Sequence, residues 1–125
     1  MSVGERALAT TRVVVEAAEE KLASDVRVID VSATLGIAEI FVIVSGANER
    51  QVGAIVDEIE KRSHLAGYKP LYREGGREDS WVLLDYFDVI VHVQHVEARA
   101  RYGLDRLWKD CPLIEASAWA GAEGP

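Results

Sequence analysis

Hydrophobic and polar residues alternate along residues 80–93 in the pattern of two short β-strands joined by a tight turn at Tyr86-Phe87. Because successive strand side chains point to opposite faces, this alternation separates an aliphatic face from a mixed one. The aliphatic face consists of Val82, Leu84, Val89, Val91 and Val93. The mixed face consists of Trp81, Leu83, Asp85, Asp88, Ile90 and His92. We expect the first face to join the core and the second to lie open.

A two-residue connection also predicts which residues of the two strands face each other. The predicted pairs are Asp85 with Asp88, Leu83 with Ile90, and Trp81 with His92. Two like charges directly opposite each other destabilise a sheet, so a cation from this chain or from a partner should relieve them. An open face with a tryptophan, aliphatic side chains, a histidine and a carboxylate pair suits docking.

The first half of the chain predicts two helices and two strands. Apolar residues at spacings of three and four predict a helix of about 20 residues near the amino terminus. Residues 25–31 and 39–45 predict strands, and the second is so continuously apolar that we expect it to be buried on both faces. Asn48 can cap a second helix, which Gly67 ends.

The second half adds three strands and a helix. Residues 70–74 predict a short strand before a flexible turn at 75–79, and residues 97–109 predict a helix with a possible break at Gly103. Residues 111–125 predict a flexible tail behind a single domain of residues 1–110. The order α-β-β-α-β-β-β-α predicts an α/β fold, with a single mixed sheet of about five strands and helices packed on it.

Composition restricts the possible surroundings and partners. A single cysteine, Cys111, excludes an intrachain disulfide and a thiolate metal cluster, and it favours a reducing cytoplasm. The sequence shows no secretory signal, transit peptide or membrane-spanning run, so we expect a cytoplasmic protein without membrane contact. The net charge of −7 argues against broad contact with nucleic-acid phosphates and favours a basic protein as partner.

Candidate chemistry is sparse. His92 and His95 suggest a metal site, but residues three apart on a strand point to opposite faces. Asp30, Asp85 and Asp88 resemble a carboxylate set for two-metal phosphoryl or nucleotidyl transfer, yet the sequence contains no Asp-x-Asp. We therefore expect no catalytic, cofactor-binding or metal-binding residue. An active nucleotidyl or phosphoryl transferase that uses Asp85 and Asp88 stays open as the alternative.

Several short motifs stand out between about residue 30 and residue 108: Asp30-Val31, Ile43-Val-Ser-Gly46, Arg50-Gln-Val52, Glu74-Gly75, Trp81-Val-Leu-Leu-Asp85, Asp88-Val-Ile-Val-His92, Arg101-Tyr102-Gly-Leu104 and Leu107-Trp108. Together they resemble the Iojap/RsfS family, the ribosomal silencing factors. One position departs from the pattern, because Phe87 stands where the family usually has glycine before the aspartate.

The resemblance implies a nucleotidyltransferase-like fold that has lost catalysis, and hence a protein that is not an enzyme. It implies binding to the large ribosomal subunit through the basic protein L fourteen, where the factor blocks joining of the small subunit and represses translation. It also implies a homodimer with little direct nucleic-acid contact. From the motifs and the mixed face together, the expected partner-binding residues are Glu74, Trp81, Leu83, Asp85, Tyr86, Phe87, Asp88, His92, Arg101 and Tyr102.

Overall fold

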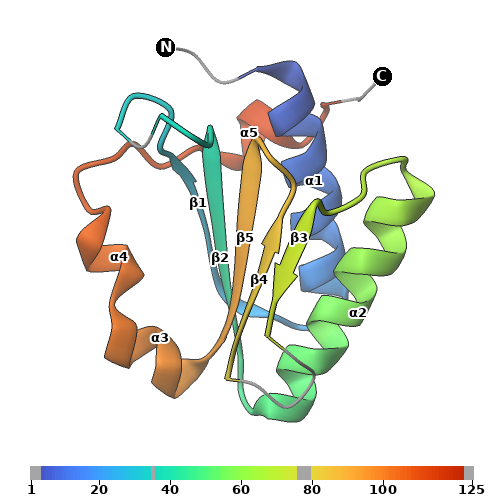
Figure 1. The fold of residues 1–125 in the computed structure, drawn as a ribbon, viewed down its shortest axis with the longest axis vertical. Coiled ribbons are helices and arrows are strands. Elements are labelled where there is room, and N and C mark those ends of the chain that lie inside the picture. The colour runs from blue at the N-terminus through green and yellow to red at the C-terminus, as the bar shows by residue number, and fades with distance from the viewer. Residues whose placement is uncertain (1–3, 35, 76–79, 123–125) are drawn as a thin grey trace.

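A computed structural model describes residues 4–34, 36–75 and 80–122 (Figure 1). The elements in chain order are α1 (Glu5–Glu20), β1 (Ser24–Asp30), β2 (Ile40–Gly46), α2 (Glu49–Leu65), β3 (Tyr72–Glu74), β4 (Trp81–Asp85), β5 (Val89–His95), α3 (Val96–Tyr102), α4 (Leu104–Leu107) and α5 (Ala116–Trp119). The predicted order is confirmed, with the last helix divided into α3 and α4 at Gly103, whose φ is +62°. Most of the turn predicted at 75–79 lies outside the described residues. Within the described ranges, each helix is too short or too polar to cross a bilayer.

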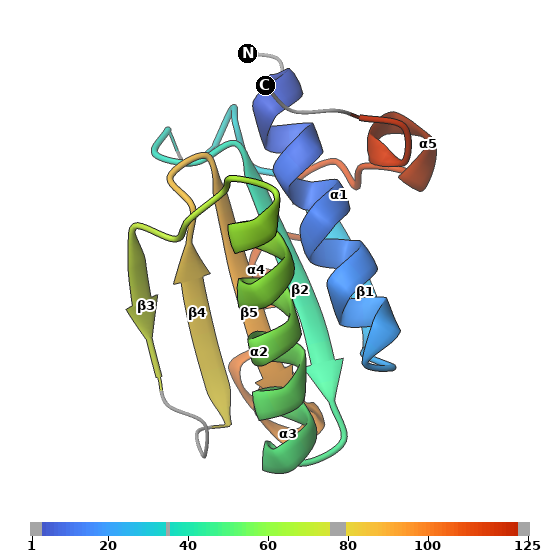
Figure 2. The same ribbon diagram turned by 90° about the vertical axis from the view of Figure 1, so that its right-hand side faces the viewer.

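The five strands form one mixed sheet in the order β1-β2-β5-β4-β3. β2 and β5 run parallel at its centre, and the other neighbours pair antiparallel. Helices α1 and α2 lie across one face of the sheet, whereas α3 and α4 lie on the other (Figures 1 and 2). The predicted α/β architecture is therefore confirmed.

The core lies mainly between the sheet and helices α1 and α2. Each residue of β2 is buried, as its continuous apolar run predicts for a strand with a neighbour on each side and helices on both faces. The aliphatic face of β4 and β5 also enters this core, where it meets the apolar stripes of α1 and α2. Alternation along the hairpin therefore predicts correctly that the aliphatic face is buried, but the second face is open only in part, because His92 is buried there as well.

The turn between β2 and α2 also fixes the end of α1. Asn48 caps α2 by accepting a hydrogen bond from the Gln51 backbone N–H at 2.9 Å, as predicted. The Gln51 amide accepts from the backbone of Ala47 and donates to the carbonyls of Lys21 and Leu22. One side chain thus satisfies backbone groups at the start of one helix and the end of another.

Residues 111–122 pack along the body of the protein. Residues 112–114 run antiparallel beside residues 28–30 of β1 and make two backbone hydrogen bonds of 2.8 Å with them. Helix α5 follows and packs against α1, where Trp119 is buried. Residues 111–122 therefore differ from the flexible tail expected from composition. They form backbone hydrogen bonds with β1, and the Trp119 side chain packs in the apolar core.

Candidate docking face

The pairing of β4 with β5 differs from the predicted register by two residues. Asp85 lies opposite Ile90, Leu83 opposite His92, and Trp81 opposite Gln94. The prediction of Asp85 opposite Asp88 is therefore wrong. Because the shift is an even number of residues, each of these strand side chains keeps its predicted face.

The turn itself explains the shift. The Tyr86 backbone N–H donates to the Val89 carbonyl at 2.8 Å, and the Asp88 N–H donates back to the Tyr86 carbonyl at 3.0 Å. Phe87, between them, has a φ of +78°, a left-handed conformation that favours glycine. The Asp85 carboxylate accepts the Phe87 N–H at 2.7 Å. This turn leaves the Phe87 side chain 70% exposed.

Tyr86 and Asp88 are buried, in contrast to the surface positions expected for them. The Tyr86 hydroxyl lies 2.8 Å from Ser63 Oγ on α2, and burial raises the pKa of Tyr86 to about 12. Burial also raises the pKa of the Asp88 carboxyl, whose Oδ1 has no hydrogen-bond partner among the described residues. The expected carboxylate pair is thus reduced to Asp85 alone at the surface of the hairpin.

His92 is also buried, on the sheet face where α3 and α4 lie. Its Nδ1 accepts a hydrogen bond from Trp81 Nε1 at 3.1 Å, and its ring meets Phe41 edge-on at 4.9 Å. Burial lowers the pKa of His92 to about 4, so the imidazole is neutral at pH 7. His92 therefore supports Trp81 from beneath instead of reaching the surface.

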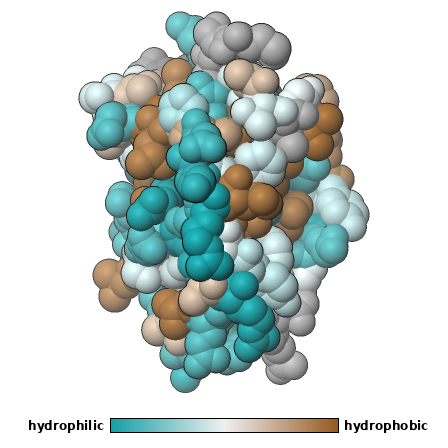
Figure 3. Space-filling model, turned by 90° about the vertical axis from the view of Figure 1, so that its left-hand side faces the viewer, coloured by the Kyte–Doolittle hydropathy of each residue, from teal (hydrophilic) through white to brown (hydrophobic). Residues whose placement is uncertain are grey.

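The part of this sheet face that α3 and α4 leave open contains carboxylates, aromatic rings and aliphatic side chains. We define it as the docking face, formed by Tyr72, Glu74, Trp81, Leu83, Asp85 and Ile90. The first two residues are exposed and the other four are half-buried. Figure 3 views the molecule from the side of α3 and α4 and shows apolar surface beside a hydrophilic ridge.

Strand β3 supplies two of these side chains. Tyr72 lies beside Asp85 and Glu74 beside Leu83 in the β3–β4 ladder, whereas Arg73 points the other way and pairs with Glu60 of α2 at 2.7 Å. Alternation over residues 70–74 places Tyr72 and Glu74 on one face. Tyr72 could therefore have been included with Glu74 among the expected partner-binding residues, from which it is missing.

The two acidic side chains of the docking face lack a cationic partner within the described part of the chain. Glu74 accepts a hydrogen bond from the Tyr72 hydroxyl at 3.3 Å, and Asp85 accepts one from a backbone N–H. Neither makes an ion pair with a described lysine, arginine or histidine. The face therefore presents negative charge that a cationic partner can neutralise.

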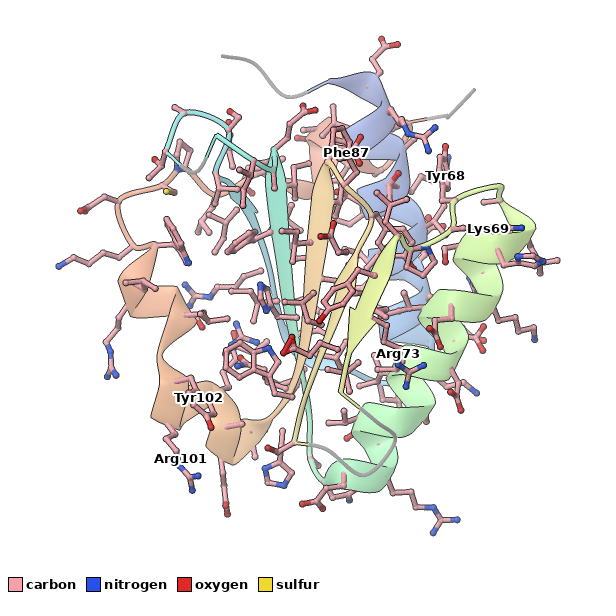
Figure 4. The ribbon with its side chains drawn as sticks, viewed as in Figure 1. Tyr68, Lys69, Arg73, Phe87, Arg101 and Tyr102 are labelled. Atoms are coloured by element: carbon pink, nitrogen blue, oxygen red, sulfur yellow. The ribbon has the colours of Figure 1, made fainter. Side chains whose placement is uncertain are left out.

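Aromatic side chains border the docking face at both ends. Tyr102, on α3, packs against Trp81 with ring centroids 4.7 Å apart, and Phe87 lies at the opposite end of the sheet (Figure 4). Arg101 is exposed on α3 next to Tyr102. The structure thus brings Glu74, Trp81, Leu83 and Asp85 together, and it places Phe87, Arg101 and Tyr102 at or near the border of the face.

Sequence reasoning misses Arg99, which is only 7% exposed. Its guanidinium binds both carboxylate oxygens of Asp105 at 2.9 Å each. The spacing could have pointed to Arg99, because it lies three residues before Tyr102 and therefore on the same side of a helix. The prediction instead selects Arg101, which the structure leaves in solvent.

The candidate metal ligands do not converge. Among the described residues, no group of three or more histidine, cysteine, aspartate or glutamate side chains could hold a metal ion. The Asp30 carboxylate accepts hydrogen bonds from the backbone and hydroxyl of Ser32. Asp85 holds the hairpin turn and Asp88 is buried beside it, so the three aspartates serve separate local roles.

Comparisons with known proteins agree on one family. A family model described as "Ribosomal silencing factor during starvation" matches residues 4–123. Proteins named ribosomal silencing factor RsfS from Halalkalibacterium halodurans and Bacillus subtilis are 39% and 36% identical to the chain, covering 81% and 83% of it and 86% and 88% of their own lengths. A crystal structure of a Chromobacterium violaceum protein superposes with a TM-score of 0.77 at 28% identity, covering 87% of this chain and 88% of that one.

Proposed function

The chain belongs to the family of ribosomal silencing factors, and from this premise we propose that it binds the large ribosomal subunit through the protein L fourteen and prevents the small subunit from joining. Its relatives are named as regulatory silencing factors and not as enzymes, in agreement with the expectation that this chain is not an enzyme. The alternative of a transferase that uses Asp85 and Asp88 gains no support from the separate roles of these two side chains.

The observation that carries the proposal is the docking face, where Glu74 and Asp85 have no cationic partner among the described residues. Complementary charge speeds the encounter of two proteins and disfavours wrong partners. A basic ribosomal protein therefore matches this face better than an acidic or apolar surface does. The net charge of −7 adds a long-range attraction between the whole protein and a positively charged partner.

The side chains of the face have distinct proposed roles. Trp81 is the central anchor, because interface hot spots are enriched in tryptophan and lie in well-packed surroundings. Leu83 and Ile90 supply apolar contact beside it, and Phe87 and Tyr102 extend the aromatic border. The buried Tyr86 and His92 act from beneath, by holding the hairpin and the indole ring in place. Asp88 holds the turn through its backbone N–H, which donates to the Tyr86 carbonyl.

Three further properties belong to the proposal. The protein acts in the cytoplasm, where a partner on the ribosome would meet it. It makes little direct contact with nucleic acid, because phosphate contacts rely on lysine and arginine and its net charge is −7. It forms a homodimer in solution, and the docking face can serve either the second copy or the ribosome.

Sedimentation through sucrose gradients tests this function. The purified protein is added to separated large subunits, to separated small subunits, and to a mixture of both under conditions that allow joining. We expect it to migrate with large subunits, to remain at the top with small subunits, and to reduce the joined peak in the mixture. Failure to migrate with large subunits would refute the proposed binding, and undiminished joining despite binding would refute the block.

A further inference from the structure

Helix α3 is attached to the sheet by very few side chains. Only Ala98 and Arg99 are buried along its length, and alanine offers little apolar area. The surface beneath α3 and α4 is also partly polar. Among the described residues, His92 Nε2, both amide atoms of Gln94 and Trp108 Nε1 are buried without a hydrogen-bond partner. Polar atoms add little apolar burial, so this contact stabilises the helix less than an all-aliphatic one would.

Arg99 supplies the directional attachment that α3 otherwise lacks. Besides its two bonds to Asp105, its Nη1 donates to Ser45 Oγ at 2.9 Å and to the backbone carbonyl of Asp25. One guanidinium thereby joins α3 to α4, to the end of β2 and to the start of β1. Planar two-point pairing of arginine with a carboxylate fixes orientation as well as distance.

The charges around this cluster reinforce it. Arg27 lies 3.3 Å from the Asp105 carboxylate, and the Asp25 carboxylate lies 3.6 Å from Arg99 Nη2. The hydrogen bonds from Arg99 lower the pKa of the Asp105 carboxyl. Asp105 is therefore ionised over the neutral range.

Tyr102 follows Arg99 by three residues on the same short helix and packs against Trp81 of the docking face. We propose that Arg99 is a positioning residue for partner binding, which holds α3 so that Tyr102 stacks on Trp81 and completes the aromatic border of the docking face. The effect on binding rests on the proposed function, whereas the effect on Tyr102 does not. Arg99 itself has no part in the contact, because it is buried.

Replacement of Arg99 by methionine tests this role, because methionine keeps the length of the side chain and removes every donor. Arg106→Met is the matched control, since Arg106 is exposed on the neighbouring α4 and the charge lost is the same. Asp105→Asn disrupts the pair from the other side, and Arg99→Lys keeps the charge without the planar fork. The measurements are nuclear Overhauser contacts between the Trp81 and Tyr102 rings, amide hydrogen exchange, and affinity for large subunits.

In Arg99→Met and Asp105→Asn we expect the ring contacts to weaken, the amides of α3 to exchange at least tenfold faster, and the amides of β2 and β5 to stay protected. The affinity of these two variants for large subunits should fall severalfold. The affinity of Arg99→Lys should lie between those of Arg99→Met and the unaltered protein, and that of Arg106→Met should not change. Unaltered ring contacts in a folded Arg99→Met protein would overturn the positioning role. Lost ring contacts with full affinity would overturn its link to binding, whereas absence of binding by the unaltered protein would count against the proposed function instead.

Discussion

The indole of Trp81 donates a hydrogen bond to Nδ1 of His92 at 3.1 Å, diagonally across the β4–β5 ladder. Because an indole N–H can only donate, Nδ1 must be unprotonated and the neutral imidazole carries its hydrogen on Nε2. Protonation of His92 would remove the acceptor and place a charge in a buried site. The orientation of the proposed anchor therefore depends on the protonation state of a residue that does not reach the surface.

Acid should destabilise the fold through His92. Burial lowers its pKa in the folded protein from 6.5 to about 4, so the unfolded chain binds the extra proton first as pH falls. The stability that the neutral ring contributes is present above pH 6.5 and is lost progressively toward pH 4. We expect the free energy of unfolding to fall by about 1.4 kcal/mol per pH unit at most in this window.

Urea unfolding at a series of pH values measures this slope. His92→Asn should flatten the curve between pH 4 and 6.5, because asparagine retains an acceptor but does not titrate. His64→Asn serves as the control, since His64 is exposed on α2, and it should keep the slope of the unaltered protein. A curve for His92→Asn as steep as that of the control would disprove the assignment.

Trp81→Ala should weaken binding to large subunits by about 2 kcal/mol, or roughly thirtyfold in Kd, if the indole is the central anchor. Circular dichroism checks that the variant remains folded, and cosedimentation at several protein concentrations gives the affinity. Leu65→Ala removes an exposed apolar side chain at the end of α2, which lies on the opposite face of the sheet, and this variant should bind normally. Wild-type affinity in a folded Trp81→Ala protein would exclude Trp81 as anchor.

Neutralising Glu74 and Asp85 should slow association with the basic partner. The double variant Glu74→Gln, Asp85→Asn keeps both side-chain shapes, including the acceptor for the Phe87 N–H. We expect a severalfold lower on-rate at low salt and a smaller difference as salt screens the charges.

Stopped-flow mixing with large subunits gives this on-rate. Glu19→Gln with Glu115→Gln changes the net charge equally at two exposed sites away from the face. If both double variants slowed binding to the same degree, the effect would come from total charge and not from the docking face.

Two replacements of Phe87 should separate the effect of its backbone conformation from the effect of its side chain. Phe87→Gly and Phe87→Ala both remove the exposed ring, but only glycine adopts a φ of +78° without strain. We expect the glycine variant to be more stable than the alanine variant by about 1 kcal/mol in thermal unfolding. Both should bind large subunits more weakly than the unaltered protein. Equal stability of the two variants would show that the turn is unstrained.

The sequence predicts those features that depend on local periodicity. Alternation along residues 80–93 places each strand side chain on its correct face, and the apolar run of residues 39–45 identifies the central strand. The register could not be predicted, because it depends on a turn in which Phe87 adopts an unusual conformation and Asp85 holds its backbone. Burial of His92 depends on Phe41 and Trp81, which pack against its ring from two other strands.

The same limit applies to the charged residues of the candidate site. The pattern identifies Asp85 as accessible, but the fate of Asp88 depends on how the turn folds against the remainder of the protein. Arg101 and Arg99 look alike in sequence, and only the positions of Asp105 and Ser45 decide which one is buried. Long-range pairing of this kind leaves no local periodic signal.

The strand-like segment at residues 112–114 has a consequence for solubility. Outer strands with free backbone groups are templates on which other chains can add and grow into fibrils. Here the protein occupies one border of its sheet with its own carboxyl-terminal segment, and the strand at the other border, β3, is only 3 residues long. A chain shortened after Asp110 would lose this protection along β1 and should aggregate as its concentration rises.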